Sequence, residues 1–135
     1  MFLLEFLFCR TGFVIACIGS AVGMEIFNDV NRPVYVAVDE NDSVMGYAFC
    51  IKKKQPFSTN MVPFDSLFID DLCVDQNIRG KHIGQKIFEH VKEEAKKMGC
   101  YEVTLNVWEG NDTARRFYEK MGMVPKETQM EFILK

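Results

Sequence analysis

The sequence lacks the features of several large protein classes. It has only two histidines, and its five cysteines include no CxxC pair, so neither a zinc site nor a disulfide framework has support. Lysine and arginine number 16 against 19 acidic residues, a net charge of −3, so no overall positive field favours nucleic-acid binding. We therefore expect no metal, no nucleic-acid partner, and reduced thiols in a cytoplasmic protein.

Long hydrophobic runs are also missing, although residues 1–24 are strongly apolar. The longest uncharged run, residues 11–24, is 14 residues long, whereas a membrane span needs about 20. Three interpretations stay open: a buried helix or strand packed on the main domain, a secretion signal, or a natural start at Met24. The acidic Glu5 ahead of the lone Arg10 argues against the signal. We expect no membrane span.

The rest of the chain has the composition of one globular domain. At 135 residues it suits a single domain, and 48% hydrophobic residues exclude disorder as its main state. Alternating and β-branched patterns predict strands, and polar stretches such as the Lys-rich residues 52–63 predict loops. The expected strands are residues 34–38, 43–51, 66–74, 101–108 and 129–134.

Two helices interrupt these strands. From Lys81, apolar residues recur at spacings of four, four, four and three up to Met98, and Gly99 supplies a stop. Asn111 offers an N-cap for a second helix, which ends at Gly122. The order predicts a mixed α/β domain with one sheet.

The loop at residues 79–84 carries the first chemical signal. A strand leads into this basic, Gly-containing loop, and the loop opens a helix. Free N–H groups and the helix dipole make such a place an anion site suited to phosphate. An ordinary structural turn is the alternative, because neither a P-loop nor a GxGxxG motif is present.

Two linked motifs give the loop its context. VDQNIRGKHIGQKIFEHV resembles the acyl-CoA-binding motif of the GNAT superfamily of N-acetyltransferases, Gln/Arg-x-x-Gly-x-Gly/Ala, with Arg79 and Gly84 at its ends. NVWEGNDTARRFYEKMGM resembles the second signature of that family. The resemblance covers residues 34–134 and implies one domain with a mostly antiparallel sheet, splayed at the acyl-CoA site and flanked by helices. Relatives begin with a strand and two helices, so residues 1–24 are atypical.

The resemblance also implies a binding site for acetyl-CoA. Backbone groups of Leu72 and Val74 would bind the pantetheine arm like an added strand, and N–H groups of residues 79–85 would hold the pyrophosphate. Asn111 would contact the pantetheine or the adenosine side, and Tyr118 would point toward the thioester sulfur. The complete set implied for the donor is Leu72, Cys73, Val74, Arg79, Gly80, Lys81, His82, Ile83, Gly84, Gln85, Asn111 and Tyr118.

Acetyl transfer needs a base, an oxyanion donor and an acid. Asp70 is the first candidate for the base and Asp71 the second, and at most one should face the cleft because neighbouring strand residues alternate. A backbone N–H near Val74 could polarise the carbonyl, and Tyr118 could protonate the departing thiolate. Core packing is the alternative for Tyr118.

Three residues stand apart from the pattern. His82 replaces the usual first glycine of the motif, which we expect a right-handed backbone to accommodate. For Cys73 we favour burial over a nucleophilic role. Trp108 could wall the cleft or pack beneath it.

The sequence thus predicts an N-acetyltransferase that transfers acetyl from acetyl-CoA to a primary amine, by direct attack in a ternary complex. The acidic pair leans toward a small cationic amine, and a protein amine is also open. The alternatives are a non-catalytic module that binds acyl-CoA or a protein, and a generic binder of phosphate ligands. The resemblance and the apolar N-terminus favour a homodimer.

Overall fold

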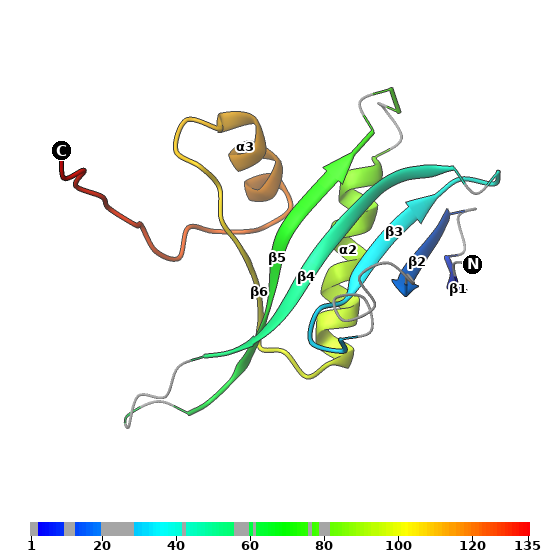
Figure 1. Cartoon of the computed structure of the whole chain (residues 1–135), viewed down its shortest axis with the longest axis horizontal. Coiled ribbons are helices and arrows are strands. Elements are labelled where there is room, and N and C mark those ends of the chain that lie inside the picture. Colours follow the sequence, from blue (N-terminus) through cyan, green and yellow to red (C-terminus); the bar gives the residue numbers. More distant parts are fainter. Residues whose placement is uncertain are drawn as a thin grey trace.

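The computed structural model describes residues 3–9, 13–19, 29–41, 43–55, 60, 62–75, 77–78 and 82–135. Within them lie six strands and two helices (Figure 1). The strands are β1 (Leu3–Cys9), β2 (Phe13–Gly19), β3 (Val34–Val38), β4 (Val44–Lys54), β5 (Asp65–Val74) and β6 (Glu102–Leu105). The helices are α2 (Ile83–Lys97) and α3 (Asp112–Lys120).

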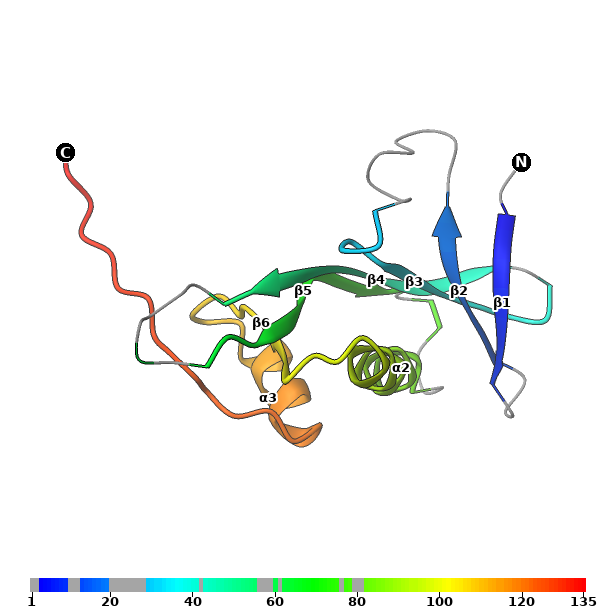
Figure 2. The ribbon, with the colours of Figure 1, turned by 90° about the horizontal axis from the view of Figure 1, so that it is seen from below.

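The six strands form one sheet in sequence order, β1 to β6. All neighbours are antiparallel except β5 and β6, which are parallel and joined by a crossover through α2. Figure 2 shows both helices on the same side of the sheet. The expected mixed α/β domain with a mostly antiparallel sheet is confirmed.

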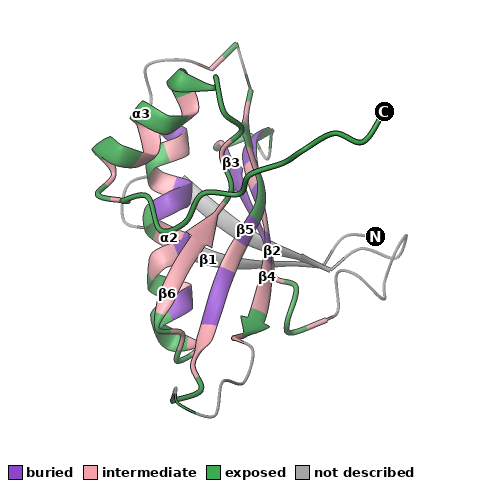
Figure 3. Cartoon of the chain, turned by 90° about the vertical axis from the view of Figure 1, so that its left-hand side faces the viewer, coloured by how far each residue is buried: buried purple, intermediate pink, exposed green. Residues whose placement is uncertain are grey.

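Helix α2 packs on the sheet through the predicted apolar stripe. Ile83, Ile87, Val91 and Ala95 are buried against strand residues of the main core (Figure 3). The helix ends before Gly99, whose φ of 75° reverses the chain as a glycine after a helix commonly does. The stripe therefore fixes the helix on the sheet, and its first turn lies beside the end of β5.

Strand β3 is buried on both faces. All five of its residues are buried, with Tyr35 and Ala37 in the helix-side core. Val34, Val36 and Val38 form a second cluster on the opposite face, against Tyr47 and Phe49 of β4. This is why VYVAV is a continuous apolar run.

The atypical N-terminal segment contributes strands. β1 pairs with β2, and β2 pairs with β3, so the sheet extends in place of the strand and two helices expected of relatives. Of the interpretations left open by the sequence, a strand joined to the main domain agrees with this pairing. Neither of the helices described here has the length and apolar character needed to cross a bilayer.

Three predictions about strands and loops are wrong in whole or in part. Lys52, Lys53 and Lys54 continue β4 because residues 52–54 pair with 65–67 of β5, whereas the sequence predicted a loop. The strand predicted at residues 101–108 is limited to 102–105, where β5 offers a partner. Residues 129–134 were predicted as a strand but form none, and they are exposed. A strand pattern alone does not supply the neighbour that a strand requires.

Candidate active site

The sheet opens between β5 and β6. Their pairing ends with Ile69 opposite Leu105, yet β5 continues to Val74. Among the described residues, the last part of β5 has no strand partner on that side. This is the splay implied by the family resemblance, and it leaves one edge of β5 open beside α3 and the start of α2 (Figure 1).

The backbone alternation determines which groups lie on the open edge. The N–H of Asp75 donates to the carbonyl of Met45 over 2.8 Å, and a Cβ at Gly46 would lie 2.7 Å from the carbonyl oxygen of Cys73, so this oxygen is on the β4 side. Residues 73 and 75 therefore direct their backbone groups toward β4. In an antiparallel pair the intervening residues direct theirs the other way. Leu72 and Val74 consequently present N–H and C=O groups to the open edge.

A β-bulge lies at the beginning of this segment. Phe49 and Cys50 are consecutive on β4, but they pair with Asp71 and Ile69, so Asp70 is the extra residue on β5. A bulge shifts the side-chain alternation of the strand that contains it.

The bulge places both aspartates on one face. Ile69 before it and Leu72 after it both pack against the helix-side core, so the two residues between them lie on the opposite side. Asp70 and Asp71 are both exposed there. The expectation that these two neighbouring residues face opposite sides of the strand is therefore wrong. It assumed a regular strand, and no residue of the sequence signals the bulge.

Asp71 belongs to a polar cluster that the sequence analysis missed in part. The phenol of Tyr47 on β4 donates to Asp71 Oδ2 over 3.1 Å. This hydrogen bond, with burial and the nearby Cys73, raises the pKa of Tyr47 to about 12. Tyr47 is directly opposite Cys73 in the β4–β5 register. The sequence predicted both strands but not their pairing, so it could not identify Tyr47 as a neighbour of Asp71.

Helix α3 brings Tyr118 to the same end of β5. Asn111 caps the helix by accepting the N–H of Ala114 over 3.2 Å, as predicted. The half-buried Tyr118 packs edge-on against Phe117 and beside Phe88 of α2. Burial raises the pKa of Tyr118, and the negative charge of Asp71 raises it further. The phenol thus stays protonated and lies within electrostatic reach of Asp71.

The predicted donor loop is described only in part. Arg79, Gly80 and Lys81 lie outside the described residues. His82 is exposed and has φ 55° and ψ 37°, so the expected right-handed backbone is wrong. Left-handed geometry suits the glycine found in relatives, and histidine is among the residues that tolerate it.

The first turn of α2 follows His82. Ile83 is buried in the core, while Gln85 is exposed. Gly84 serves close packing, since a Cβ there would lie 3.3 Å from the Phe117 ring and 3.5 Å from Val74. The absent side chain lets α2, α3 and the end of β5 converge at one point.

The structure corrects the expectation for Cys73 and excludes one of the two interpretations of Trp108. Cys73 is exposed, so its expected burial is wrong: on the bulged strand its side chain faces the same side as Asp71. Trp108 has an exposed fraction of 88%, so it does not pack beneath the cleft.

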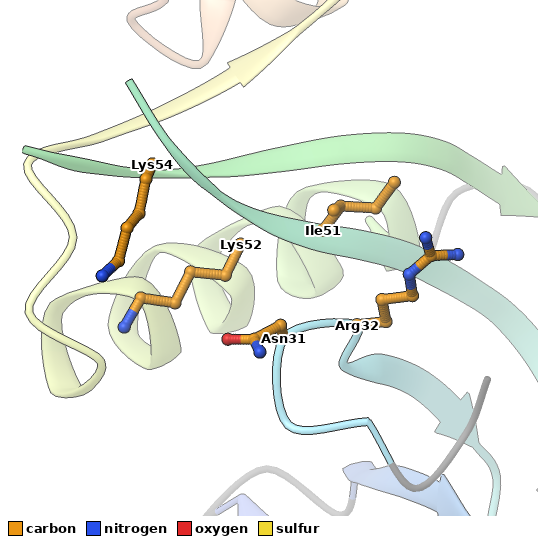
Figure 4. Close-up of a pocket in the computed structure, with 5 residues that line it drawn as sticks. All are labelled: Asn31, Arg32, Ile51, Lys52 and Lys54. Carbon is orange, nitrogen blue, oxygen red and sulfur yellow. The ribbon is translucent and has the colours of Figure 1, made fainter. Parts of the chain in front are cut away.

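A separate cavity lies at the far end of β4. It has a volume of about 380 Å³ and is lined by Asn31, Arg32, Ile51, Lys52 and Lys54 (Figure 4). Its cations are partly neutralised, because Lys52 pairs with Asp65 at 3.2 Å and Arg32 with Asp29 at 3.8 Å. None of the predicted site residues lines it.

Segments of known proteins are similar to this sequence. A segment of 62 residues is 44% identical to glucosamine 6-phosphate N-acetyltransferase of Arabidopsis thaliana and covers 46% of this chain and 40% of that protein. A segment of 90 residues is 30% identical to the peptidyl-lysine N-acetyltransferase YjaB of Escherichia coli and covers 67% and 48%. The matched segments thus span less than half the length of these relatives.

Solved structures have the same fold as this chain. The crystal structure of the Arabidopsis thaliana glucosamine-6-phosphate N-acetyltransferase superimposes with a TM-score of 0.64 and 28% identity, over 82% of this chain and 73% of that one. Residues 11–123 match the acetyltransferase (GNAT) family, whose members use acetyl-CoA as cosubstrate. With the splayed sheet and both sequence motifs in their expected elements, the chain belongs to the GNAT family of acetyltransferases.

Proposed function

We propose that the protein is an N-acetyltransferase that moves an acetyl group from acetyl-CoA to an amine. The observation that carries the proposal is the open edge of β5, where Leu72 and Val74 present backbone groups beside Tyr118 and the acidic pair. A pantetheine arm is a chain of amides and can add to such an edge as a strand would. Its phosphates would then lie toward the start of α2, where helical N–H groups favour anions.

The chemistry follows from the side chains at the opening. A neutral amine nitrogen attacks the thioester carbonyl, the new C–N bond forms, and the C–S bond breaks. Asp71, directly or through water, takes the proton lost by the amine, and Tyr118 gives one to the departing thiolate. We favour Asp71 over Asp70 because it lies within electrostatic reach of Tyr118. Asp70 remains the second candidate.

For the acceptor we propose a cationic amine. Asp70 and Asp71 are exposed on one face, and together they attract an ammonium group and oppose an anion at the same place. Polyamines and lysine side chains meet this requirement, and the YjaB relative is named for a lysine acceptor. An amino sugar phosphate is the second candidate, because a 62-residue stretch of this chain is 44% identical to a glucosamine 6-phosphate N-acetyltransferase.

The first experiment measures binding of the proposed donor, acetyl-CoA. Calorimetric titration with acetyl-CoA, with 3′,5′-ADP as the reference ligand, should show tighter binding that requires the pantetheine arm. No binding at millimolar acetyl-CoA would reject the enzyme. Binding without turnover of any amine would favour the non-catalytic module, and equal affinity for both ligands would favour a generic phosphate binder.

The second experiment measures transfer. Thiol release should be followed with spermidine, a lysine peptide and glucosamine 6-phosphate as acceptors. Tyr118→Phe should lower kcat by about 10²-fold or more if the phenol is the acid. Tyr101→Phe, at an exposed tyrosine ahead of β6, is the matched control and should keep full activity. Preference for the sugar phosphate would reject the cationic-amine proposal alone.

A further inference from the structure

The cavity at the far end of β4 is cationic. Its lining combines one amide, one apolar side chain and three cations, namely Asn31, Ile51, Arg32, Lys52 and Lys54, and none of these residues is acidic (Figure 4). The whole chain has a net charge of −3, so this concentration of positive charge is opposite to the overall balance. A volume of about 380 Å³ is in the range of sites for small molecules. The lining therefore favours a small organic or polymeric anion over a single ion.

The three consecutive lysines of β4 are divided between the two faces of the sheet. Lys52 Nζ donates to the carbonyl of Met98 over 3.3 Å, at the end of α2, so Lys52 lies on the helix side. Lys53 Nζ lies 3.8 Å from the centroid of the Phe68 ring, and Lys53 does not line the cavity. Lys54 shares the side of Lys52, because residues two apart in a strand point the same way. The strand thus brings two of its three lysines to the cavity.

Two of the cations in the lining retain charge for a ligand. Lys52 is neutralised, since its Nζ lies 3.2 Å from Asp65 Oδ2. Arg32 has only a long contact of 3.8 Å to Asp29 Oδ2, and an ion pair between side chains as exposed as these contributes little. Lys54 is exposed and has no ion-pair partner in the part of the chain that the structure describes. Figure 4 shows Lys54 and Arg32 at opposite ends of the group of lining residues, so the available charges lie apart.

The backbone of β4 adds a hydrogen-bond donor at the same edge. The N–H of Lys52 donates to the carbonyl of Asn31 over 2.6 Å, and Asn31 is held in turn by Asp29 Oδ1, which accepts its N–H over 2.9 Å. The N–H of Gln55 donates across the hairpin to β5. Alternation directs the N–H of Lys54 to the same edge as that of Lys52, where it has no acceptor among the described residues. This N–H can donate to an anion that also contacts the Lys54 ammonium.

We propose that this cavity binds a small molecule that carries two or more phosphate groups. One phosphate accepts hydrogen bonds from the ammonium group and the N–H of Lys54. Another accepts from the guanidinium of Arg32, whose planar fork can donate two parallel hydrogen bonds to one phosphate. The amide of Asn31 adds a neutral donor between them, and Ile51 contacts the uncharged part of the ligand.

The proposed phosphate site is separate from the proposed active site. Lys54 pairs with Asp65 at the beginning of β5, whereas the opening of the sheet involves Leu72 and Val74 at its end. Residues 65 and 72 are more than about 20 Å apart along an extended strand. The inference is therefore independent of the proposed function, because it uses neither the acetyl-CoA site nor acetyl transfer.

The experiment compares neighbouring lysines on opposite faces of β4. Calorimetric titration without Mg²⁺ measures the affinity for inorganic triphosphate and for fructose 1,6-bisphosphate, which distinguish contiguous from separated phosphates. Lys54→Gln and Arg32→Gln should each weaken binding of the tighter ligand about tenfold. Lys53→Gln removes the same charge from the adjacent residue and should change the affinity by less than about twofold. No binding of either ligand at millimolar concentration, or equal losses for the Lys53 and Lys54 variants, overturns the proposal.

Amide chemical shifts locate the bound ligand. Signals of residues 31–32 and 52–54 should move during the titration and saturate with the affinity that calorimetry gives. The start of α2 is the other place where phosphate groups are expected to bind, under the proposed function. Shifts confined to residues 82–85 would mean that the ligand uses that place and would overturn the cavity as a phosphate site. A protein that fails to bind acetyl-CoA can still show shifts at residues 52–54, so the two proposals fail separately.

Discussion

The phenol of Tyr47 donates a hydrogen bond to Asp71 Oδ2 over 3.1 Å across the β4–β5 hairpin, and this bond fixes the carboxylate at the opening of the sheet. The bulge at Asp70 puts Asp71 on the face of the sheet that carries Tyr47. A carboxylate held from one side keeps its remaining lone pairs in a defined direction. We infer that Tyr47 is a positioning residue for the proposed base.

Tyr47→Phe should therefore lower kcat/KM by about tenfold without weakening acetyl-CoA binding. A hydrogen bond to a charged group contributes about 1.5–3 kcal/mol, and loss of the lower part of that range corresponds to about tenfold. Steady-state kinetics with calorimetry of the donor distinguish the two effects. If Tyr47 only supports the fold, affinity and thermal stability should fall together with the rate.

A double-mutant cycle identifies the aspartate involved. Asp71→Asn should lower kcat by about 10²-fold or more. Adding Tyr47→Phe should lower kcat little further, because either substitution disrupts the same hydrogen-bonded pair. Asp70→Asn combined with Tyr47→Phe should be additive. Additivity at Asp71 together with coupling at Asp70 would transfer the role of base to Asp70.

His82→Gly should stabilise the protein. A left-handed backbone costs a residue with a side chain about 1–2 kcal/mol, and the greater freedom of glycine in the unfolded chain returns about 0.5–1 kcal/mol of that. We expect a net gain of about 0.5–1 kcal/mol in the free energy of unfolding, measured by urea denaturation. His82→Ala retains a Cβ at φ 55° and should gain nothing. A gain of the same size for alanine would show that the imidazole, not the backbone, is the cause.

Much of the fold could be predicted because its patterns are local. The stripe from Ile83 to Ala95 needs only the helical period, and Asn111 needs only the next turn of helix to act as a cap. The bulge at Asp70 depends on the register of two strands far apart in the sequence. The extension of β4 through Lys54 and the unpaired state of residues 129–134 depend in the same way on which neighbours the strands find.

The residues of the candidate site likewise differ in whether the sequence alone could identify them. The motif residues around Gly84 and Tyr118 are visible in the sequence because family members share their spacing. Tyr47 belongs to no motif, and only the pairing of β4 with β5 brings it to Asp71. The left-handed backbone of His82 could not be predicted either. A histidine that replaces a glycine does not reveal whether the backbone keeps the left-handed conformation that glycine favours.

The cysteines should differ sharply in reactivity. Burial raises the pKa of the Cys50 thiol to about 12, so its thiolate is scarce, and the side chain is only 2% exposed. Cys73 is exposed at the opening of the sheet. Under brief treatment with iodoacetamide, peptide mass mapping should find Cys73 modified and Cys50 untouched until the protein unfolds.

The same labelling experiment, repeated in the presence of acetyl-CoA, tests the proposed donor site. A pantetheine arm along Leu72 and Val74 would cover Cys73 and should slow its modification several-fold. Cys100 is the control, because it is half-buried near Lys52 at the other end of β5 and should react at the same rate with or without acetyl-CoA. Equal rates at Cys73 with saturating acetyl-CoA would place the donor elsewhere.

His90 should make the stability of the fold depend on pH. The ring lies edge-on to Tyr35 at 5.1 Å, and its Nε2 is buried, 3.9 Å from Glu94 Oε1 and without a hydrogen-bond partner among the described residues. Burial lowers the pKa of His90, and the opposing effect of Glu94 is smaller. The folded protein therefore binds this proton less readily than the unfolded chain does.

The sign of the effect follows from linkage. Above the unfolded-state pKa of about 6.5 the imidazole is neutral in both states, so the contribution of His90 to stability is fully retained. As the pH falls below that value the unfolded chain gains a proton first, and stability is lost until the pH passes the lower folded pKa. Urea denaturation between about pH 7.5 and 5 should thus show a decline that His90→Gln reduces. His82→Gln removes the exposed histidine and should leave the decline unchanged. Identical pH profiles for the two variants would mean that carboxylates alone cause the loss of stability in acid.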